Sequence, residues 1–405
     1  MKIAEINMYA NYSTGKIMMG IAECARKESY TVHTYSAKTY VRGLKKQYPV
    51  IKDHTYFGST FESMIHVYVG MLTGNNGFLS YFATRKLIGE LKKFSPDIIH
   101  LHNIHAFCIN LPLLFNFLKK NDIKVIWTLH DCWPFTGHCP HFVLASCDKW
   151  ETGCHHCTQL SVYPRSYVDN TKSMWKRKKE LFSGLNMTLV TPSEWLSNLV
   201  KKSFLKDYPV KVINNGLDLS VFMPTKSDFR TKCVIEDKKI ILGVAVNWGK
   251  RKGLDVFIEL SKKLSEDYAI VLVGTDDAID KQLPQNIVSI HRTQNQKELA
   301  EIYTAADLFV NPTREDTYPT VNMEALACGT PVLTFRTGGS PEIIDETCGS
   351  VVDVDDVDAM YKEIIRICET HPYSEEACLE RAKSFDMNER FKEYLTLYED
   401  ITHST

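Results

Sequence analysis

The chain has 405 residues, of which 44% are hydrophobic and 24% are charged, a composition that suits one large globular domain or two. Its formal net charge is -1, which gives the whole chain no bias toward nucleic acid or membrane. The charge is uneven, because residues 1–216 carry 27 Lys and Arg against 15 Asp and Glu, whereas the remainder is acidic. This asymmetry indicates that the first half meets an anionic surface or ligand, the alternative being chance.

The N-terminal residues Met1 to Met8 follow a strand pattern rather than that of a leader peptide. No stretch reaches the roughly 20 apolar residues needed to cross a bilayer. Cysteines in apolar surroundings, such as Cys24, Cys328 and Cys368, are typical of reduced thiols in a core. We therefore expect a cytoplasmic protein.

Short β-branched runs alternate with amphipathic helical patterns, which predicts parallel sheets with helical crossovers. The strands predicted in the first half are 2–6, 97–101, 124–129, 188–190 and 210–213. A second series follows Asn214-Asn215-Gly216, with strands at 239–246, 269–273, 287–290, 307–310, 331–335 and 350–354. We predict an α/β fold of two doubly wound, Rossmann-like domains that face each other across a cleft, with ligands at the carboxyl ends of the strands.

The predicted N-terminal domain covers residues 1–216 and includes a Cys/His-rich loop at 132–157. The second domain covers 225–385, and a closing helix over 386–405 is expected to cross the domain junction. Segment 56–81 is aromatic and interrupted by glycines, which fits a membrane-touching patch, an insertion near the cleft or an ordinary covered insertion.

The most informative motif is the run of residues 314–332, a loop and short helix after a predicted strand. Asp316 in the loop and Glu324 in the helix lie eight positions apart. The first N–H groups of that helix, at Thr320 and Val321, are suited to a phosphate. A helix carboxylate suits ribose hydroxyls, and a loop carboxylate suits the hydroxyls of a sugar.

This stretch resembles the acid-x7-Glu signature of the retaining family-4 glycosyltransferases (group 1, GT-B fold), close to members that build capsule, colanic acid and exopolysaccharide. The resemblance implies that Glu324 holds the ribose of a nucleotide-sugar and Asp316 the transferred sugar. That family has Glu at the first acidic position, whereas this chain has Glu315 followed by Asp316, so either acid can face the sugar; the spacing favours Asp316.

Three consecutive cations, Lys250-Arg251-Lys252, follow the first strand of the second domain and open a predicted helix. Fixed cations there would stabilise a departing nucleoside diphosphate without a metal. In the related family an Arg lies five positions before the Lys, but this chain has Asn247 there, so Arg251 is the expected substitute. A solvated charge cluster is the alternative.

Two positions in the first domain complete the predicted site. Gly15, in a turn after the first strand, permits close approach of backbone to phosphate or sugar. His130 ends an apolar strand and is expected to hydrogen-bond a sugar hydroxyl, the place that the resemblance also gives it. A structural histidine that caps the strand is the alternative.

The cysteines Cys139, Cys147, Cys154 and Cys157 have spacings that fit a tetrahedral structural zinc, with disulfides or packed free thiols as alternatives. Two other patterns are weaker. Asp353-Val354-Asp355 has the spacing of manganese-binding acids. It precedes a predicted helix, however, and acidic residues in that place stabilise the positive N-terminal end of the helix dipole. The basic run 175–179 is expected to be a solvated face or to touch anionic lipid.

We therefore predict a metal-independent glycosyltransferase with a nucleotide-sugar donor, whose base lies near Gly274 and the turn 291–293, and the resemblance implies that it retains the anomeric configuration. We expect catalysis to need no cofactor. The expected acceptor is a glycan or lipid-linked oligosaccharide at the inner membrane face, with peripheral contact to anionic lipid and no nucleic acid partner. Two alternatives are a zinc hydrolase using His130 and Asp131, and a nucleotide-sugar-binding protein without turnover.

Overall fold

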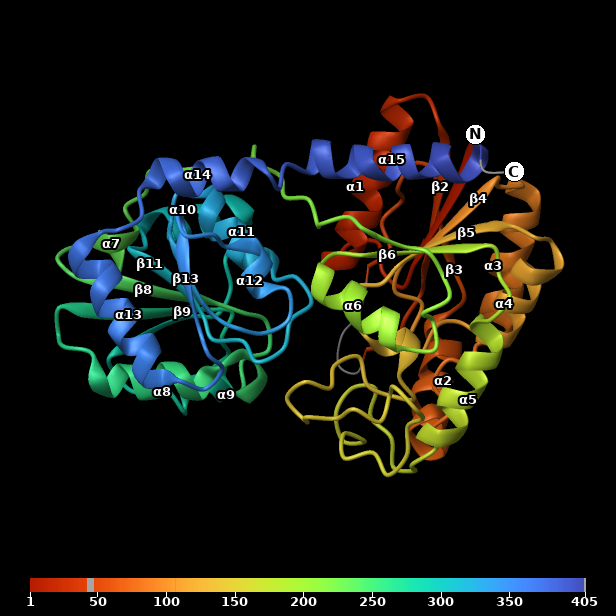
Figure 1. The fold of residues 1–405 in the computed structure, drawn as a ribbon, viewed down its shortest axis with the longest axis horizontal. Coiled ribbons are helices and arrows are strands. Elements are labelled where there is room, and N and C mark those ends of the chain that lie inside the picture. Colours follow the sequence, from red (N-terminus) through yellow and green to blue (C-terminus); the bar gives the residue numbers. More distant parts are fainter. Residues whose placement is uncertain (42–46, 106, 404–405) are drawn as a thin grey trace. The chain divides into compact units, whose positions relative to one another are not determined.

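The computed structural model describes residues 1–41, 47–105 and 107–403, which form two compact units (Figure 1). The first unit comprises Met1–Asn214 together with Arg390–Thr405, and the second comprises Asn215–Glu389. Each unit is a parallel sheet with its helices, as the sequence predicts for a pair of Rossmann-like domains. No helix of the described residues is both long and apolar enough to span a membrane.

The sheet of the first unit has seven strands, all paired in parallel, in the order β3-β2-β1-β4-β5-β6-β7. The strands are β1 (Lys2–Asn7), β2 (Thr31–Ala37), β3 (His54–Phe57), β4 (Ile98–Leu101), β5 (Lys124–Thr128), β6 (Met187–Thr191) and β7 (Val210–Val212). The helices are α1 (Ser13–Lys27), α2 (Thr60–Thr73), α3 (Tyr81–Phe94), α4 (Leu111–Lys120), the 3₁₀ turn η1 (Trp133–Phe135), α5 (Thr171–Phe182) and α6 (Glu194–Lys202).

The second sheet has six parallel strands in the order β10-β9-β8-β11-β12-β13. They are β8 (Lys239–Val244), β9 (Tyr268–Val273), β10 (Ile287–Ile290), β11 (Leu308–Asn311), β12 (Val332–Phe335) and β13 (Gly349–Val352). The helices are α7 (Phe229–Lys232), η2 (Lys250–Lys252), α8 (Leu254–Lys263), α9 (Asp277–Asp280), α10 (Gln296–Ala305), α11 (Thr320–Ala327), α12 (Ser340–Ile343), α13 (Val357–Thr370) and α14 (Glu375–Lys383).

Each sheet has one point at which the strand order reverses. In the first sheet the chain runs outward from β1 to β3 and then returns to β4 on the other side of β1. In the second it runs from β8 to β10 and returns to β11 beside β8. Loops diverge at such a point and leave a crevice at the carboxyl ends of the strands, where open α/β sheets bind ligands.

The strands β2 and β3 were not among the predicted ones. The sequence of β2, Thr-Val-His-Thr-Tyr-Ser-Ala, is rich in polar residues, yet Thr34 and Ser36 are buried. Their hydroxyls hydrogen-bond the two ring nitrogens of His54 on β3, which offsets the cost of burying them. Parallel pairing with β1 therefore overrides the weak apolar signal of this segment.

The closing helix α15 (Met387–His403) is divided between the units, since its residues from Arg390 onward belong to the first. Phe391 lies against Gly20 of α1, where a Cβ atom would be only 2.4 Å from the Phe391 ring. Tyr394 and Tyr398 are buried in the first unit. Residues 404 and 405 of the helix predicted over 386–405 lie outside the described residues.

Candidate active site

Cations and acids from two neighbouring strands meet at the reversal point of the second sheet. The turn η2 follows β8, and the loop 312–319 follows β11, the strand beside it. The Lys252 Nζ atom lies 2.7 Å from Asp316 Oδ2, and both side chains are partly buried. The two motifs that the sequence places 64 residues apart thus form one ion pair.

The cationic turn is fixed by backbone contacts. Gly253 ends η2 with a φ of +75°, and a Cβ atom there would lie 2.4 Å from the carbonyl oxygen of Pro312. Glycine is therefore required for the turn to pack on the acidic loop. Arg251 accepts a hydrogen bond from Arg314 N at 2.9 Å and donates from Nη1 to the carbonyl of Glu315 at 3.3 Å. Lys252 and Arg251 thus both contact the acidic loop.

The structure separates the two adjacent acids. Glu315 is 4% exposed, whereas Asp316 is partly exposed and makes the contact with Lys252. The Oδ1 atom of Asp316 also accepts from Tyr318 N at 3.3 Å. The position picked out by the eight-residue spacing is the one beside the cation.

The second acid, Glu324, lies on α11. The Tyr303 hydroxyl donates to Glu324 Oε2 at 3.0 Å. Burial raises the pKa of Tyr303 well above its usual value, and the charge of Glu324 raises it further, so Tyr303 is a neutral donor that orients the carboxylate. Thr320 and Val321 occupy the first turn of α11, which within the described chain has no side-chain cap on its N–H groups. Such a helix start suits an anion.

Two further parts of this site are not predicted from the sequence. The buried guanidinium of Arg314 makes a two-pronged ion pair with Asp255, at 2.8 and 2.9 Å, and a third bond to Asp355 at 2.6 Å. The turn 337–339 after β12 reaches the same loop: Gly338 has a φ of +54°, and a Cβ atom on it would collide with the carbonyl oxygen of Asp316. The Gly-Gly-Ser-Pro sequence after a strand was a signal that could have indicated this turn.

In the first unit, Gly15 lies in α1, which follows β1, and His130 follows β5; β4 separates these two strands in the sheet. A Cβ atom on Gly15 would lie 2.6 Å from Tyr9 O, so glycine lets α1 pack on the preceding loop. That packing accounts for the glycine by itself, and its contact with a donor phosphate stays a prediction. His130 Nε2 lies 3.1 Å from His102 Nδ1, and burial lowers the pKa of His130 to about 4. The ring is therefore neutral at pH 7.

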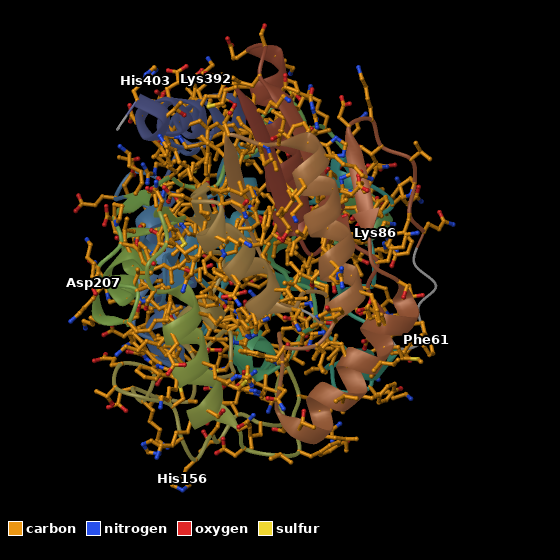
Figure 2. The ribbon with its side chains drawn as sticks, turned by 90° about the vertical axis from the view of Figure 1, so that its right-hand side faces the viewer. Phe61, Lys86, His156, Asp207, Lys392 and His403 are labelled. Carbon is orange, nitrogen blue, oxygen red and sulfur yellow. The ribbon has the colours of Figure 1, made fainter. Side chains whose placement is uncertain are left out.

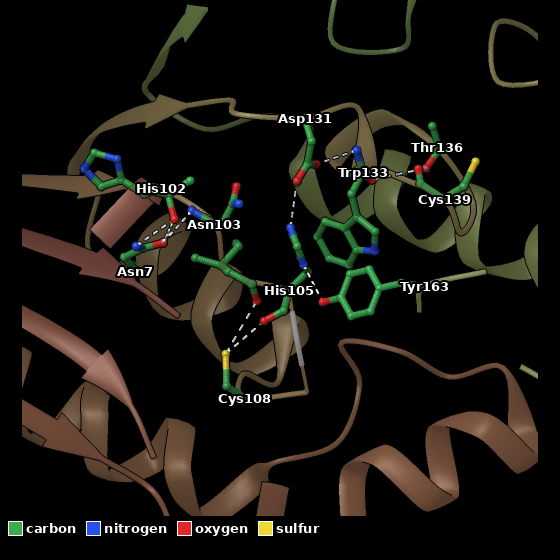
Figure 3. A network of polar contacts seen from close by, with 12 residues as sticks. Asn7, His102, Asn103, His105, Cys108, Asp131, Trp133, Thr136, Cys139 and Tyr163 are labelled. Atoms are coloured by element: carbon green, nitrogen blue, oxygen red, sulfur yellow. Dashed lines mark hydrogen bonds and ion pairs between the residues drawn. The ribbon is translucent and has the colours of Figure 1, made fainter. Parts of the chain in front are cut away.

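Asp131 has a separate set of partners (Figure 3). Its Oδ2 atom lies 2.9 Å from His105 Nε2, and its Oδ1 accepts from Trp133 N at 2.9 Å. His105 Nδ1 lies 2.9 Å from the Tyr163 hydroxyl. Asp131 thus holds the loop after β5 in place, while His130 contacts a different histidine.

The four candidate zinc ligands line one small pocket of about 30 Å³ in the Cys/His-rich loop. Gly137 N donates to Cys154 Sγ at 3.1 Å, and Gln159 N donates to Cys157 Sγ at 3.4 Å. No disulfide joins Cys139, Cys147, Cys154 and Cys157 in the described chain. Among the described residues, two groups of three side chains have metal-ligating atoms within 4.8 Å of one another, and these cysteines are in neither.

The two weaker patterns are explained by structure. Asp353 and Asp355 form ion pairs with Arg336 and Arg314, and Asp356 caps α13 by accepting from Ala359 N at 2.8 Å. The expectation of a solvated face for the basic run 175–179 is wrong at Lys178. That side chain is fully buried and donates to the carbonyls of Trp133 and Thr136.

The fold and the strand-end site together define a GT-B type of α/β protein. The solved structure of sucrose-phosphate synthase from Thermosynechococcus elongatus matches with a TM-score of 0.72 and 16% identity over 100% of both chains. The Anabaena protein HepE, solved in complex with UDP and glucose, matches with a TM-score of 0.65 and 14% identity over 99% of this chain and 100% of that one.

The family is given by the sequence itself. Residues 238–370 match the model described as "Glycosyl transferases group 1", and residues 59–221 match "Glycosyltransferase Family 4". WcaC of Escherichia coli, whose name places it in colanic acid biosynthesis, is 26% identical over 280 residues, which are 65% of this chain and 65% of WcaC. The chain belongs to the group 1, family 4 glycosyltransferases, so the family predicted from the acidic motif is confirmed.

Proposed function

We propose that this glycosyltransferase is retaining and metal-independent, and moves a sugar from a nucleotide-sugar to a glycan or lipid-linked oligosaccharide in polysaccharide biosynthesis. The observation that carries the proposal is the Lys252–Asp316 pair beside Arg251 and the start of α11. A leaving nucleoside diphosphate gains negative charge in the transition state, which fixed cations and helix N–H groups stabilise. The complexes of HepE with UDP and with UDP-glucose support a donor of this class.

In this proposal Glu324 holds the ribose, and Asp316 and His130 bind hydroxyl groups of the transferred sugar. Lys252, Arg251 and the N–H groups at Thr320 and Val321 bind the diphosphate. Bound diphosphate would compete with Asp316 for the Lys252 ammonium group and weaken their ion pair. The Asp316 carboxylate could then accept hydrogen bonds from hydroxyl groups of the sugar. The leaving phosphate then assists attack on the same face of the sugar, which retains the anomeric configuration.

The acceptor side has a candidate pocket in the first unit. A hollow of about 290 Å³ lies at the carboxyl ends of β1 and β2 and is lined by four tyrosines among other residues. These are Tyr9, Tyr12, Tyr48 and Tyr56. Tyrosine rings offer an apolar face and a hydroxyl, which together suit a sugar ring. The pocket therefore supports a carbohydrate acceptor.

Contact with an anionic membrane is part of the proposal and rests on α2. Phe61, Ile65, Tyr68 and Leu72 lie at helical spacing on one side of α2 and are 66%, 44%, 45% and 63% exposed. Figure 2 shows Phe61 on α2 and Lys86 on the neighbouring α3, where Lys86 and Arg85 are exposed. An exposed apolar stripe with exposed cations on the next helix, in a unit with excess positive charge, fits the surface of an anionic bilayer.

A structural zinc in the Cys/His-rich loop is a further part of the proposal. The pocket volume suits a single ion, and N–H donors already reach two of the sulfurs, as thiolates require. Zinc would draw the sulfurs closer and would hold a loop with little regular structure. The hydrolase alternative has less support, because the family is one of glycosyltransferases and Asp131 is engaged by His105 rather than His130.

A thermal-shift screen of nucleoside diphosphates and nucleotide-sugars tests the donor site. A cognate ligand at about 100 times its Kd should stabilise the protein by about 2.7 kcal/mol and raise its unfolding temperature by several degrees. Lys252→Ala and Glu324→Ala should abolish the shift, whereas Lys250→Ala, which removes the exposed cation of the same turn, should keep it. Sugar transfer by the parent should survive EDTA.

The outcomes separate the alternatives. If no nucleotide-sugar shifts the parent, the donor assignment is wrong. Binding that survives Asp316→Ala, with no sugar released by the parent in the presence of any acceptor, would instead indicate a binding protein without turnover.

A further inference from the structure

Lys178 is a buried lysine on α5 that the donor and acceptor sites do not use. Its side chain is 0% exposed. In the part of the chain that the structure describes, its amino group bonds two backbone carbonyls and no carboxylate. A buried amino group costs free energy that an apolar side chain of similar size would not, so packing alone does not account for a lysine here.

The two carbonyls belong to the turn η1 and to the residue that ends it. Lys178 Nζ donates to Trp133 O at 2.7 Å and to Thr136 O at 3.1 Å, and it lies 3.3 Å from the centroid of the Trp133 ring. Burial lowers the pKa of Lys178 well below its usual value. A neutral amine still has two N–H groups, so both hydrogen bonds exist in either charge state.

The N–H side of the same turn is held by Asp131 (Figure 3). Asp131 Oδ1 accepts from Trp133 N, the first N–H of η1, at 2.9 Å. The bonds inside the turn are longer, at 3.3 Å from Phe135 N to Cys132 O and 3.4 Å from Thr136 N to Trp133 O. Internal bonds of a 3₁₀ turn are weak, so the position of η1 depends mainly on Lys178 and Asp131.

The turn anchors the chain directly after His130, the residue that precedes Asp131. We propose that Lys178 is a positioning residue for sugar transfer, which fixes η1 and thereby the backbone that carries His130. This deepens the proposed function and rests on the sugar-binding role given there to His130. Transfer is sensitive to such positioning, because a displacement of about 1 Å at a reacting group can cost two orders of magnitude in rate.

The Cys/His-rich loop is the other element that could need Lys178. The Thr136 hydroxyl donates to Cys139 O at 2.6 Å, and Gly137 N donates to Cys154 Sγ at 3.1 Å. Lys178 therefore lies where this loop joins η1. A role confined to the loop predicts loss of zinc and of stability when Lys178 is replaced, whereas the positioning role predicts loss of kcat.

Lys178→Met is the test variant, because methionine has a similar length but no N–H donor. We expect kcat to fall about ten-fold with a change of less than about three-fold in KM for the donor, and amide hydrogen exchange at residues 131–136 to become faster. Lys178→Arg keeps N–H donors and should stay within about three-fold of the parental kcat. Lys172→Met, the same change at an exposed position of α5, should alter none of these properties.

A double-mutant cycle with His130→Ala shows whether Lys178 acts through His130. If it does, adding Lys178→Met to His130→Ala should lower kcat by less than about two-fold further. If Lys178→Met does not fold, Lys178→Gln replaces it in the cycle, since its shorter side chain cannot reach both carbonyls.

Fully additive losses, parental kcat in Lys178→Met, or unchanged hydrogen exchange at 131–136 would each overturn the proposal. Zinc loss with unchanged kcat in Lys178→Met would assign Lys178 to the Cys/His-rich loop and would also overturn it. Parental kcat in His130→Ala would instead refute the sugar-binding role of His130 in the proposed function, and the exchange measurement would still test whether Lys178 fixes the turn.

Discussion

Arg314 joins three parts of the donor site through one guanidinium. It is 5% exposed, and it pairs with Asp255 at the start of α8 and with Asp355 before α13. It also donates to the carbonyl of Lys250 in the cationic turn. The sequence gives no hint of this role, because the paired acids lie 59 and 41 residues away and only the fold brings them together.

Arg314→Gln should lower the free energy of unfolding by about 1 to 2 kcal/mol, since it removes a buried charged donor that bonds two half-exposed carboxylates and the carbonyl of Lys250. Arg336→Gln is the control: Arg336 pairs with Asp353, but both side chains are largely exposed, so the expected change is near zero. Thermal unfolding of the two variants checks this. Equal effects would mean that Arg314 contributes no more than a surface pair.

The stability difference between the parent and Arg314→Gln should decrease at acidic pH. Burial alone would raise the pKa of Asp255, but hydrogen bonds from Arg314 and its charge outweigh burial and hold that pKa below its usual value. The stabilisation is therefore present above the unfolded pKa of about 4 and is lost as pH falls through the folded pKa. The difference in unfolding temperature between parent and variant should be constant from about pH 7 to 5 and should narrow below about pH 4.

At the scale of elements, the sequence predicts the buried strands well and the short turns poorly. Near-continuous apolar runs such as β9 and β12 are typical of strands that are covered on both faces of a sheet. The three cations instead form the separate 3₁₀ turn η2 and do not open α8, because Gly253 in the left-handed region divides the two. Spacing alone picked out Asp316, whereas the burial of Glu315 depends on tertiary contacts that spacing does not contain.

We predict that the Cys/His-rich loop binds zinc. The purified protein should contain about one zinc per chain by elemental analysis, and Cys157→Ser should lose the metal and unfold at a lower temperature. Cys233→Ser, which changes a partly buried cysteine of the second unit, should retain both properties. Protein with no zinc, and with the same unfolding temperature in Cys157→Ser as in the parent, would show that the thiols are only packed together.

At the scale of the whole molecule, the apolar stripe of α2 should direct membrane binding. The protein should co-sediment with anionic vesicles more than with neutral ones, and the double change Phe61→Ser with Leu72→Ser should reduce this binding at least ten-fold. Val234→Ser removes a side chain that is 80% exposed in the second unit and should have no effect. Equal partitioning of the parent between anionic and neutral vesicles would argue against the membrane assignment.

The sharing of α15 between the units has a consequence for biosynthesis. Tyr394 and Tyr398 of α15 contact Thr128 on β5 and His100 on β4. During synthesis, β4 and β5 therefore lack these contacts until α15 has emerged from the ribosome, which happens only after the entire second unit has been made. Nascent chains that end before Arg390 should consequently hold an incomplete first unit that is exposed to proteases and chaperones. The first unit would then complete its folding only after α15 has been synthesised.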